Sequence, residues 1–474
     1  MNASPPAFPQ LAERFATQRR AFAADPNPPV AARRERLDRL LKLIDDNEDA
    51  LVAAVDADFG GRAAQETRIA EIFVARRAVL HARRHLARWM RTRRVATALP
   101  FLPARNRLAP QPLGVVGVVS PWNYPIQLTL CPLVAALAAG NRALIKPSEL
   151  TPRVSALLAE LAEKYFDPDL VSAVAGDAET GKAFVALPFD HLLFTGSTAV
   201  GRQVAAAAAA NLTPVTLELG GKSPAIFDRS CDLLKASERV AAGKLFNAGQ
   251  TCVAPDYLMV PRDLGEAAAA VLGAAMRRLY PTLAANPDYT AIISERHRAR
   301  LIGLVAEARD AGAEIIEINP AKESFAESRK LAPTIVIGAS ETTRLMREEI
   351  FGPVLPIVEY DEVDDAIAYV NRGDRPLALY WFGRDAARRE RVLRETISGG
   401  VTVNDCLLHF VQEGQPCGGV GASGVGAYHG EWGFRTFSKL KPAFHQSDWS
   451  GFPLLRPPYG KTTDWVLGAL KRLP

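Results

Sequence analysis

One cysteine stands in a stretch whose composition is typical of a loop. Cys252 lies within FNAGQTCVAPDY, residues 246–257, with glycine, proline and small polar residues on either side. Free cysteines are most often buried and inert, and for this stretch taken alone that interpretation stays open. Reactive groups, however, tend to lie on loops that a rigid scaffold holds. Cys252 is therefore a candidate nucleophile, which would need a base and a group that stabilises an oxyanion beside it.

Two other stretches contain residue types that suit these two roles. Glu218 lies in LELGGKSP, residues 217–224, where burial would raise its pKa and suit it to act as a general base. Asn123 lies in SPWNYP, residues 120–125, and can donate a side-chain N–H to an oxyanion, with a plain turn residue as the alternative. Together the three would let a thiolate attack an aldehyde, pass hydride to a nicotinamide and clear the thioester with water.

A turn containing glycines offers a place for the phosphates of such a cofactor. In FTGSTAVG, residues 194–201, Gly196 ends a strand-like run and Gly201 lies in the first turn of the next helix. Phosphates bind at helix N-termini, and Ser197 and Thr198 can add hydrogen bonds. This is not the usual GxGxxG fingerprint, and a tight strand-to-helix turn explains the glycines about as well.

A lysine and a glutamate at another strand end suit the ribose of a dinucleotide. Lys146 and Glu149 lie in IKPSE, residues 145–149, within reach of a pair of ribose hydroxyls, with a surface ion pair as the alternative. A glutamate at this point would repel the 2′-phosphate of NADP. The sequence therefore favours NAD as the cofactor and leaves NADP open.

The elements that must position these residues alternate between strand and helix. Thr151 and Pro152 are residue types that begin a helix, and Gly140 with Asn141 are types that end one. The alternation up to Gly221 predicts a doubly wound parallel sheet, and its restart beyond that residue predicts a second α/β unit with a cleft between the two. The strands predicted for the first unit are 113–120, 142–149, 170–177, 191–197 and 213–221, and its helices are 127–141, 151–166, 178–187 and 199–211.

Two segments depart from this alternation. Residues 30–94 have a helical pattern rich in arginine, and we interpret the arginines as a solvated helix face and not as a nucleic-acid site. Pro100–Pro112 contains four prolines and is predicted to break the helix and not to form a central strand. The side chains predicted to face inward from the arginine-rich region are Phe73, Leu80, Leu86 and Trp89.

Length and composition set broad limits on the class of protein. A chain of 474 residues with 48% hydrophobic and 23% charged residues is expected to form two or three globular domains. The net charge of +5 is small for this length and argues against a nucleic-acid partner. The five cysteines form neither a disulfide framework nor a CxxC pair, which favours reduced thiols in the cytoplasm. We recognise no signal peptide, no membrane anchor and no metal site.

The motifs above, in this order, resemble those of the aldehyde dehydrogenase superfamily. The resemblance extends from about residue 30 to 445 and includes EEIFGP at 348–353 and GGVGASGVGAYHG at 418–430. It implies an α/β fold with a doubly wound, Rossmann-like NAD-binding domain, a second α/β catalytic domain and a small β oligomerisation arm. These parts would comprise residues 1–96 with 113–220, then 221–437, and finally 97–112 with 438–474.

The resemblance also implies a role for each motif residue. Cys252 would be the nucleophile, Glu218 the general base, and Asn123 with the Cys252 backbone N–H the oxyanion hole. Lys146 and Glu149 would hold the adenosine ribose. A homodimer is the implied assembly. The cofactor contacts implied are Trp122, Lys146, Glu149, the pyrophosphate turn Gly196, Ser197, Thr198 and Gly201, and Glu349 and Phe351 at the nicotinamide end.

Within the superfamily, GQTCVAPDY, VTVND and GAYHGEWGFRTFS resemble the branch of class 3, fatty and bacterial coniferyl aldehyde dehydrogenases. DADFGGRAAQET at 56–67 and the LLRPPYG tail are most similar to the coniferyl group, which implies an aromatic aldehyde. The alternatives are a medium- or long-chain fatty aldehyde, an acylating dehydrogenase, and a catalytically silent scaffold of the same fold. Cys417 stands where the family usually has phenylalanine, and it either alters the substrate funnel or repacks it.

Overall fold

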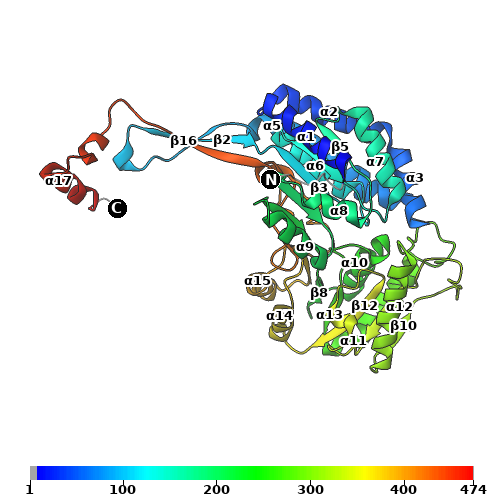
Figure 1. Ribbon diagram of the computed structural model, residues 1–474. Coiled ribbons are helices and arrows are strands. Elements are labelled where there is room, and N and C mark those ends of the chain that lie inside the picture. The colour runs from blue at the N-terminus through cyan, green and yellow to red at the C-terminus, as the bar shows by residue number, and fades with distance from the viewer. Residues whose placement is uncertain (1–7, 473–474) are drawn as a thin grey trace.

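The computed structural model describes residues 8–472, which form two α/β units and a long arm that extends away from them (Figure 1). Residues 1–7 and 473–474, the ends of the first and last predicted segments, lie outside the described residues. Within residues 8–472, no helix is both long enough and apolar enough to cross a membrane.

The first unit is built on a six-stranded sheet in the order β15-β7-β6-β3-β4-β5. All neighbours are parallel except β15, which runs antiparallel to β7. The chain builds outward from β3 in both directions, so the topological switch point lies between β3 and β6, where ligands of doubly wound sheets bind. The predicted doubly wound sheet is therefore confirmed. Its strands are β3 Val115–Val119, β4 Arg142–Lys146, β5 Val171–Ala173, β6 His191–Thr195, β7 Val215–Glu218 and β15 Gly424–Val425.

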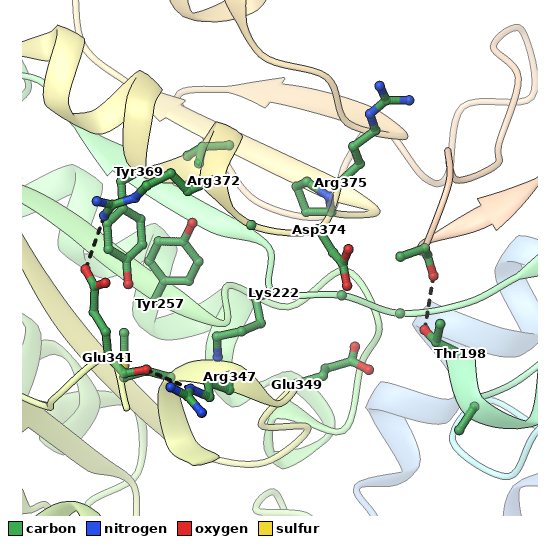
Figure 2. A pocket seen from close by; sticks show the side chains of 18 of the residues that line it. Thr198, Lys222, Tyr257, Glu341, Arg347, Glu349, Tyr369, Arg372, Asp374 and Arg375 are labelled. Carbon is green, nitrogen blue, oxygen red and sulfur yellow. Dashed lines mark hydrogen bonds and ion pairs between the residues drawn. The ribbon is translucent and has the colours of Figure 1, made fainter. Parts of the chain in front are cut away.

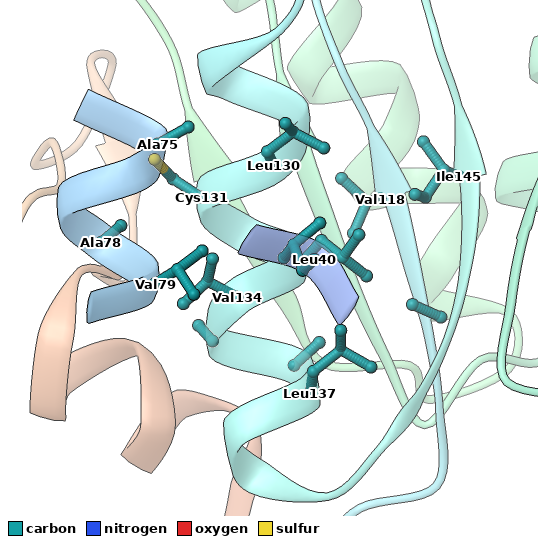
Figure 3. Packing of buried hydrophobic residues seen from close by; sticks show 14 of the residues in the cluster. Leu40, Ala75, Ala78, Val79, Val118, Leu130, Cys131, Val134, Leu137 and Ile145 are labelled. Carbon is teal, nitrogen blue, oxygen red and sulfur yellow. The ribbon is translucent and has the colours of Figure 1, made fainter. Parts of the chain in front are cut away.

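Helices cover this sheet, and α6 (Gln127–Ala139) lies at the centre of their packing. Every residue of α6 is buried, because its sequence is apolar on all sides. Figure 3 shows α6 between α5 and the strands that carry Val118 and Ile145, with Leu40 of α2 beside it. The loop containing Asn123 leads directly into this helix, so the core fixes that loop. The helices and helical turns are α1 Pro9–Ala24, α2 Val30–Asp46, α3 Glu48–Phe59, α4 Ala64–Thr67, η1 Arg68–Phe73, α5 Val74–Trp89, α7 Pro152–Tyr165, α8 Ala178–Val185, α9 Thr198–Ala209 and α16 Gly430–Thr436.

The second unit contains a seven-stranded sheet in the order β10-β11-β12-β9-β8-β13-β14, parallel except for β10. This confirms the predicted second α/β unit. The strands are β8 Pro224–Phe227, β9 Tyr257–Pro261, β10 Glu314–Glu317, β11 Thr334–Ile337, β12 Val354–Tyr360, β13 Ala378–Phe382 and β14 Gly400–Val403. The helices and helical turns are α10 Leu233–Leu245, η3 Phe246–Gly249, η4 Arg262–Leu264, α11 Gly265–Leu279, α12 Glu295–Asp310, α13 Arg344–Arg347, α14 Val363–Arg372 and α15 Ala386–Glu395.

The arm is a three-stranded antiparallel sheet in the order β1-β2-β16. β2 (Arg105–Pro112) is its middle strand, so the prediction that Pro100–Pro112 holds no central strand is wrong. The reason is that β1 pairs with residues 106–108 only, so Pro110 and Pro112 lie where β2 has one neighbour, β16. The remaining elements are β1 Arg93–Val95, β16 Ser438–His445, η2 Leu99–Phe101, η5 Phe452–Leu455 and α17 Lys461–Leu470, which lies at the far end of the arm in Figure 1.

The segment from Cys417 to Phe437, predicted as the end of the catalytic domain, returns to the first unit. β15 completes the edge of the first sheet beside β7, and α16 packs on α5 and α6. The open edge of β7 provides the unpaired backbone groups that this segment satisfies. The predicted domain boundary at residue 437 therefore does not match the structure, in which residues 417–437 pack with the first unit.

The arginine-rich region buries a different set of side chains from the one predicted. Leu86 and Trp89 are buried as expected, but Phe73 is exposed and Leu80 is only half-buried. Residues 68–73 form a π-helical turn, which adds a residue to the turn and shifts the buried face to Val74, Ala75, Ala78, Val79 and Ala82.

Helix α7 begins at the predicted residue but is capped by a different side chain. Thr151 occupies the N-cap position, yet its hydroxyl donates to the Ser148 carbonyl. The first N–H groups of the helix donate instead to the carboxylate of Asp58, at 3.1 Å from Arg153 and 2.9 Å from Val154. A capping partner from a distant helix is invisible to local sequence patterns.

Candidate active site

The loop before Cys252 has a strained backbone. Asn247 and Ala248 have φ of 53° and 50°, in the left-handed region that costs roughly 1–2 kcal/mol for a residue with a Cβ. Gly249 continues the same conformation, and a Cβ there would collide with the Gly352 carbonyl oxygen. Such a conformation persists only where the surroundings hold it.

Gln250 and Glu66 hold this loop in place. The Gln250 amide donates to the carbonyls of Asn247 at 3.1 Å and Ala291 at 3.0 Å, and its oxygen accepts from the Ile293 N–H at 2.9 Å. The Glu66 carboxylate, from α4 of the first unit, accepts the Asn247 N–H with both oxygens at 3.1 Å. Side chains from both units therefore fix the path of the chain that leads to Cys252.

Asn123 belongs to the same network, so the structure brings this predicted residue to the Cys252 loop. Its amide donates to the Gln250 carbonyl at 3.2 Å. Its own backbone carbonyl accepts from Arg62 at 2.8 Å and from the Asn247 amide at 3.1 Å. Beside it, the hydroxyls of Tyr124 and Thr251 are 2.6 Å apart, which ties the start of α6 to the residue before Cys252.

Glu218 is buried at the end of β7, and neither of its carboxylate oxygens has a hydrogen-bond partner among the described residues. Burial raises its pKa well above the ordinary value, which confirms the predicted direction. The partly exposed Cys252 thiol has its pKa raised to about 12, first by burial and then by the negative charges of Glu349 and Glu218. The two carboxyl groups therefore lie close enough to the thiol to raise its pKa.

Glu349 and Phe351 lie on a segment whose backbone is hydrogen-bonded to Asp256. The Ile350 N–H donates to Asp256 at 2.8 Å, and Lys222 pairs with the same carboxylate. The Glu349 carboxylate rests directly against Gly220, where a side chain would collide with it. Burial, followed by the charge of Asp256, raises the pKa of Glu349 to about 8.

The crevice in Figure 2 lies between the two units, and Thr198, Gly220 and Glu349 are on its walls. The Thr198 hydroxyl donates to the Ala422 carbonyl at 3.0 Å, and the Ser197 hydroxyl caps α9 by accepting the Val200 N–H. Both hydroxyls thus have partners within the protein. The N–H groups of Thr198 and Ala199 at the start of α9 are not used within the described residues.

The remaining predicted cofactor residues lie at the same edge of the first sheet. Lys146 at the end of β4 is buried and pairs with the half-exposed Glu149 at 3.3 Å. The Trp122 ring packs edge-on against Phe351 at 5.3 Å between centroids. Two of the predicted glycines leave room for neighbouring side chains. A Cβ added at Gly196 would lie 2.6 Å from the Phe194 ring, and one added at Gly201 would lie 2.6 Å from Leu219.

A second pocket, largely apolar and distinct from the crevice in Figure 2, has Cys252 in its lining. Its walls come from η1 and the start of α5, from the start of α6 and the turn before it, from the Cys252 loop and from the segment 407–411. Cys417 does not line this pocket; it is buried in the core, where its backbone pairs with Tyr428. The lining residues are Ala70, Val74, Tyr124, Gln127, Leu128, Phe246, Thr251, Cys252, Val253, Leu407, Phe410 and Val411.

A buried ion pair that the motifs did not reveal supports the Asn123 loop. Arg62 and Glu71 are fully buried and 3.2 Å apart. Glu71 also accepts the N–H groups of Ile126 at 2.7 Å and Gln127 at 3.2 Å, at the first turn of α6. Arg62 and Glu66 lie in DADFGGRAAQET, one of the stretches that carried the family resemblance. The neighbouring residues in the sequence, however, do not indicate which groups these charges contact.

Residues 10–442 match the aldehyde dehydrogenase family. The chain is 49% identical to a probable coniferyl aldehyde dehydrogenase of Pseudomonas aeruginosa, covering 96% of this chain and 94% of that protein. It is 46% identical to a coniferyl aldehyde dehydrogenase of Pseudomonas sp. strain HR199, covering 99% and 98%. The substrate-bound structure of Staphylococcus aureus AldH superposes with a TM-score of 0.91 at 36% identity, covering 97% and 99%.

The chain therefore belongs to the aldehyde dehydrogenase family. It is an enzyme that oxidises an aldehyde, and the family uses NAD or NADP for this reaction. The resemblance inferred from the seven motifs is confirmed, and so are the predicted fold and reaction.

We predict that Glu71→Gln destabilises the protein and slows the reaction. The change keeps the shape of the side chain but leaves Arg62 as an uncompensated buried charge, which costs about 3–5 kcal/mol. A shift of the Asn123 loop by about 1 Å would lower kcat/KM by about 100-fold. Urea unfolding and steady-state kinetics measure the two effects. Glu160→Gln on the exposed face of α7 is the control, and a Glu71→Gln protein as stable and active as this control would contradict the prediction.

Proposed function

We propose that this enzyme oxidises a bulky aromatic aldehyde of the coniferyl type to its carboxylic acid, with NAD as the preferred cofactor. The observation that carries the substrate class is the apolar pocket that ends at Cys252, with aromatic side chains Tyr124, Phe246 and Phe410 in its wall. Such a lining suits a flat apolar ring. Two relatives that match nearly the whole chain at 46–49% identity are named for coniferyl aldehyde, which supports the same class.

In the proposed reaction, Cys252 Sγ forms a bond with the aldehyde carbon. Because the pKa of the thiol is about 12 in the free enzyme, its proton must first pass to a base. Glu218, the unpaired carboxylate nearby, is that acceptor, and the proton returns to solvent before the next step. The Asn123 side-chain N–H and the Cys252 backbone N–H stabilise the oxyanion that forms.

The second half of the reaction releases the acid. A bound oxidised nicotinamide would supply the acceptor for the hydride that leaves the substrate carbon, and Cys252 would then carry a thioester. Glu218 then takes a proton from water, the hydroxide attacks the thioester carbonyl, and Cys252 leaves as the thiolate. The raised pKa of Glu218 makes it a stronger base once ionised than a solvent-exposed carboxylate.

The residues at the edge of the first sheet fit a dinucleotide. The unused N–H groups at the start of α9 suit a pyrophosphate, and Lys146 with Glu149 suit the adenosine ribose. Glu349 suits the hydroxyls of the second ribose, with Trp122 and Phe351 beside the nicotinamide. A 2′-phosphate would meet the negative charge of Glu149, which is why we propose NAD over NADP.

We predict that Cys252→Ala lowers turnover by at least about 1,000-fold while NAD still binds, because the bond to the aldehyde carbon cannot form. Glu218→Gln should lower steady turnover about 100- to 10,000-fold and slow thioester hydrolysis most, because the attacking water depends on this base, whereas the thiol proton can also pass to solvent. Stopped-flow absorbance of the reduced cofactor measures both. Cys231→Ala, a half-buried thiol elsewhere in the second unit, is the control. A Cys252→Ala enzyme that still turned over aldehyde would refute the nucleophile assignment.

We predict that aromatic aldehydes have the highest kcat/KM in a panel of aliphatic, benzoic and cinnamic aldehydes measured with NAD and with NADP. A preference for aliphatic aldehydes would favour the fatty-aldehyde alternative and refute the coniferyl-type proposal, and the family assignment would still hold. Equal use of NADP would refute the proposed effect of Glu149. Adding coenzyme A tests the acylating alternative, in which turnover would depend on it.

We further propose that the enzyme is a homodimer held by the arm. The arm and tail extend away from the two units (Figure 1), and many of their large apolar side chains are exposed. A surface of this kind favours burial against a second copy. The exposed apolar residues include Leu99, Phe101, Leu102, Phe444, Trp449, Phe452, Leu454, Tyr459 and Trp465.

All five cysteines are free, which supports our proposal that the enzyme works in the reducing environment of the cytoplasm. Thiol titration that found the cysteines paired in cells would refute this proposal.

We predict that replacing Trp449 and Trp465 with glutamate shifts the protein toward the monomer, because each change places a charge in the proposed contact. Light scattering after size-exclusion chromatography measures the mass. The control is Leu212→Glu, which places a charge on an exposed leucine of the first unit. A wild-type protein that runs as a monomer would refute the proposal at once.

A further inference from the structure

The pocket that leads to Cys252 contains one polar side chain to which the proposed reaction gives no role. Four of its lining residues have polar side chains: Tyr124, Gln127, Thr251 and Cys252. The hydroxyls of Tyr124 and Thr251 bind each other at 2.6 Å, and Cys252 is the proposed reacting group. Gln127 is left, and nothing in the proposed chemistry uses it.

The position of Gln127 is fixed while the oxygen of its side chain stays available. It is the first residue of α6, and its backbone N–H donates to Glu71 at 3.2 Å. Its amide nitrogen lies 3.8 Å from the sulfur of Cys131, which is a weak acceptor. Among residues 8–472 no group donates to the amide oxygen, and this oxygen is not among the fully enclosed atoms that lack partners. A donor on a bound molecule can therefore satisfy it.

The location of Gln127 along the pocket suits the end of the substrate remote from the aldehyde. Gln127 begins α6, and Tyr124 lies in the turn just before it, where its carbonyl accepts the Leu128 N–H at 3.0 Å. Tyr124 is bonded to Thr251, next to the nucleophile, and Gln127 lies three residues further along the chain on the same pocket wall.

We propose that Gln127 determines specificity for hydroxylated aromatic aldehydes, its amide oxygen accepting a hydrogen bond from the phenolic hydroxyl of the substrate. The inference rests on the proposed aromatic-aldehyde function and goes beyond it by naming the ring substituent that is recognised. A buried acceptor that a substrate hydroxyl satisfies discriminates strongly against the analogue that lacks the hydroxyl, because the acceptor is then left unpaired.

The test compares two aldehydes that differ in one group, 4-hydroxycinnamaldehyde and cinnamaldehyde. We expect wild-type kcat/KM to favour the hydroxylated aldehyde by about 10-fold or more, mainly through KM. In Gln127→Met, which keeps the length of the side chain and removes the acceptor, the ratio should fall to about one. Gln10→Leu on the exposed face of α1 is the matched control and should keep the wild-type ratio. Because the readout is a ratio within one variant, a general loss of packing does not imitate it.

Each other outcome has a defined meaning. A Gln127→Met enzyme that keeps the wild-type preference would overturn the role of Gln127. A wild-type enzyme that prefers cinnamic over aliphatic aldehydes but ignores the hydroxyl would overturn the inference and leave the aromatic-aldehyde proposal intact. A wild-type enzyme that oxidises aliphatic aldehydes and neither cinnamic one would overturn both.

Discussion

The buried pair of Arg62 and Glu71 is the contact on which the geometry of this site depends. Arg62 binds the carbonyl of Asn123, and Glu71 binds the first N–H groups of α6. A fully buried ion pair contributes little net stability compared with an apolar replacement, but it penalises any arrangement that separates the charges. Here the pair specifies where a loop and a helix begin, and the rest of the site is built around that point.

The strained turn before Cys252 shows the same principle from the opposite unit. Left-handed Asn247 and Ala248 are unfavourable by themselves, so hydrogen bonds from Glu66 and Gln250 must hold them. Glu66 comes from the first unit, whereas Asn247 and Cys252 come from the second. Contacts from both units thus hold the strained conformation of this loop.

The residues proposed to react stand out in the sequence, whereas those that hold them do not. Cys252, Glu218 and Asn123 have unusual types for their local settings, and their order along the chain matched a family. Arg62, Glu66 and Glu71 look like ordinary surface charges in a helical segment, because the backbone groups that they bind in the site lie more than fifty residues away. The same limit explains the errors in the fold: the pairing of β2 with only one strand beside its prolines, and the π-helical turn that exposes Phe73, both depend on distant packing.

The proposed chemistry lies at the boundary because neither unit has a complete set of groups. The first unit provides Asn123 and Glu218, and the second provides Cys252 and Glu349. Burial raises the pKa of Glu218, of Glu349 and of the Cys252 thiol, and the charges of Glu349 and Glu218 raise that of the thiol further. The thiol is consequently protonated and weakly nucleophilic in the free enzyme. In the proposed reaction, the thiol of the second unit therefore depends on Glu218 of the first unit to accept its proton.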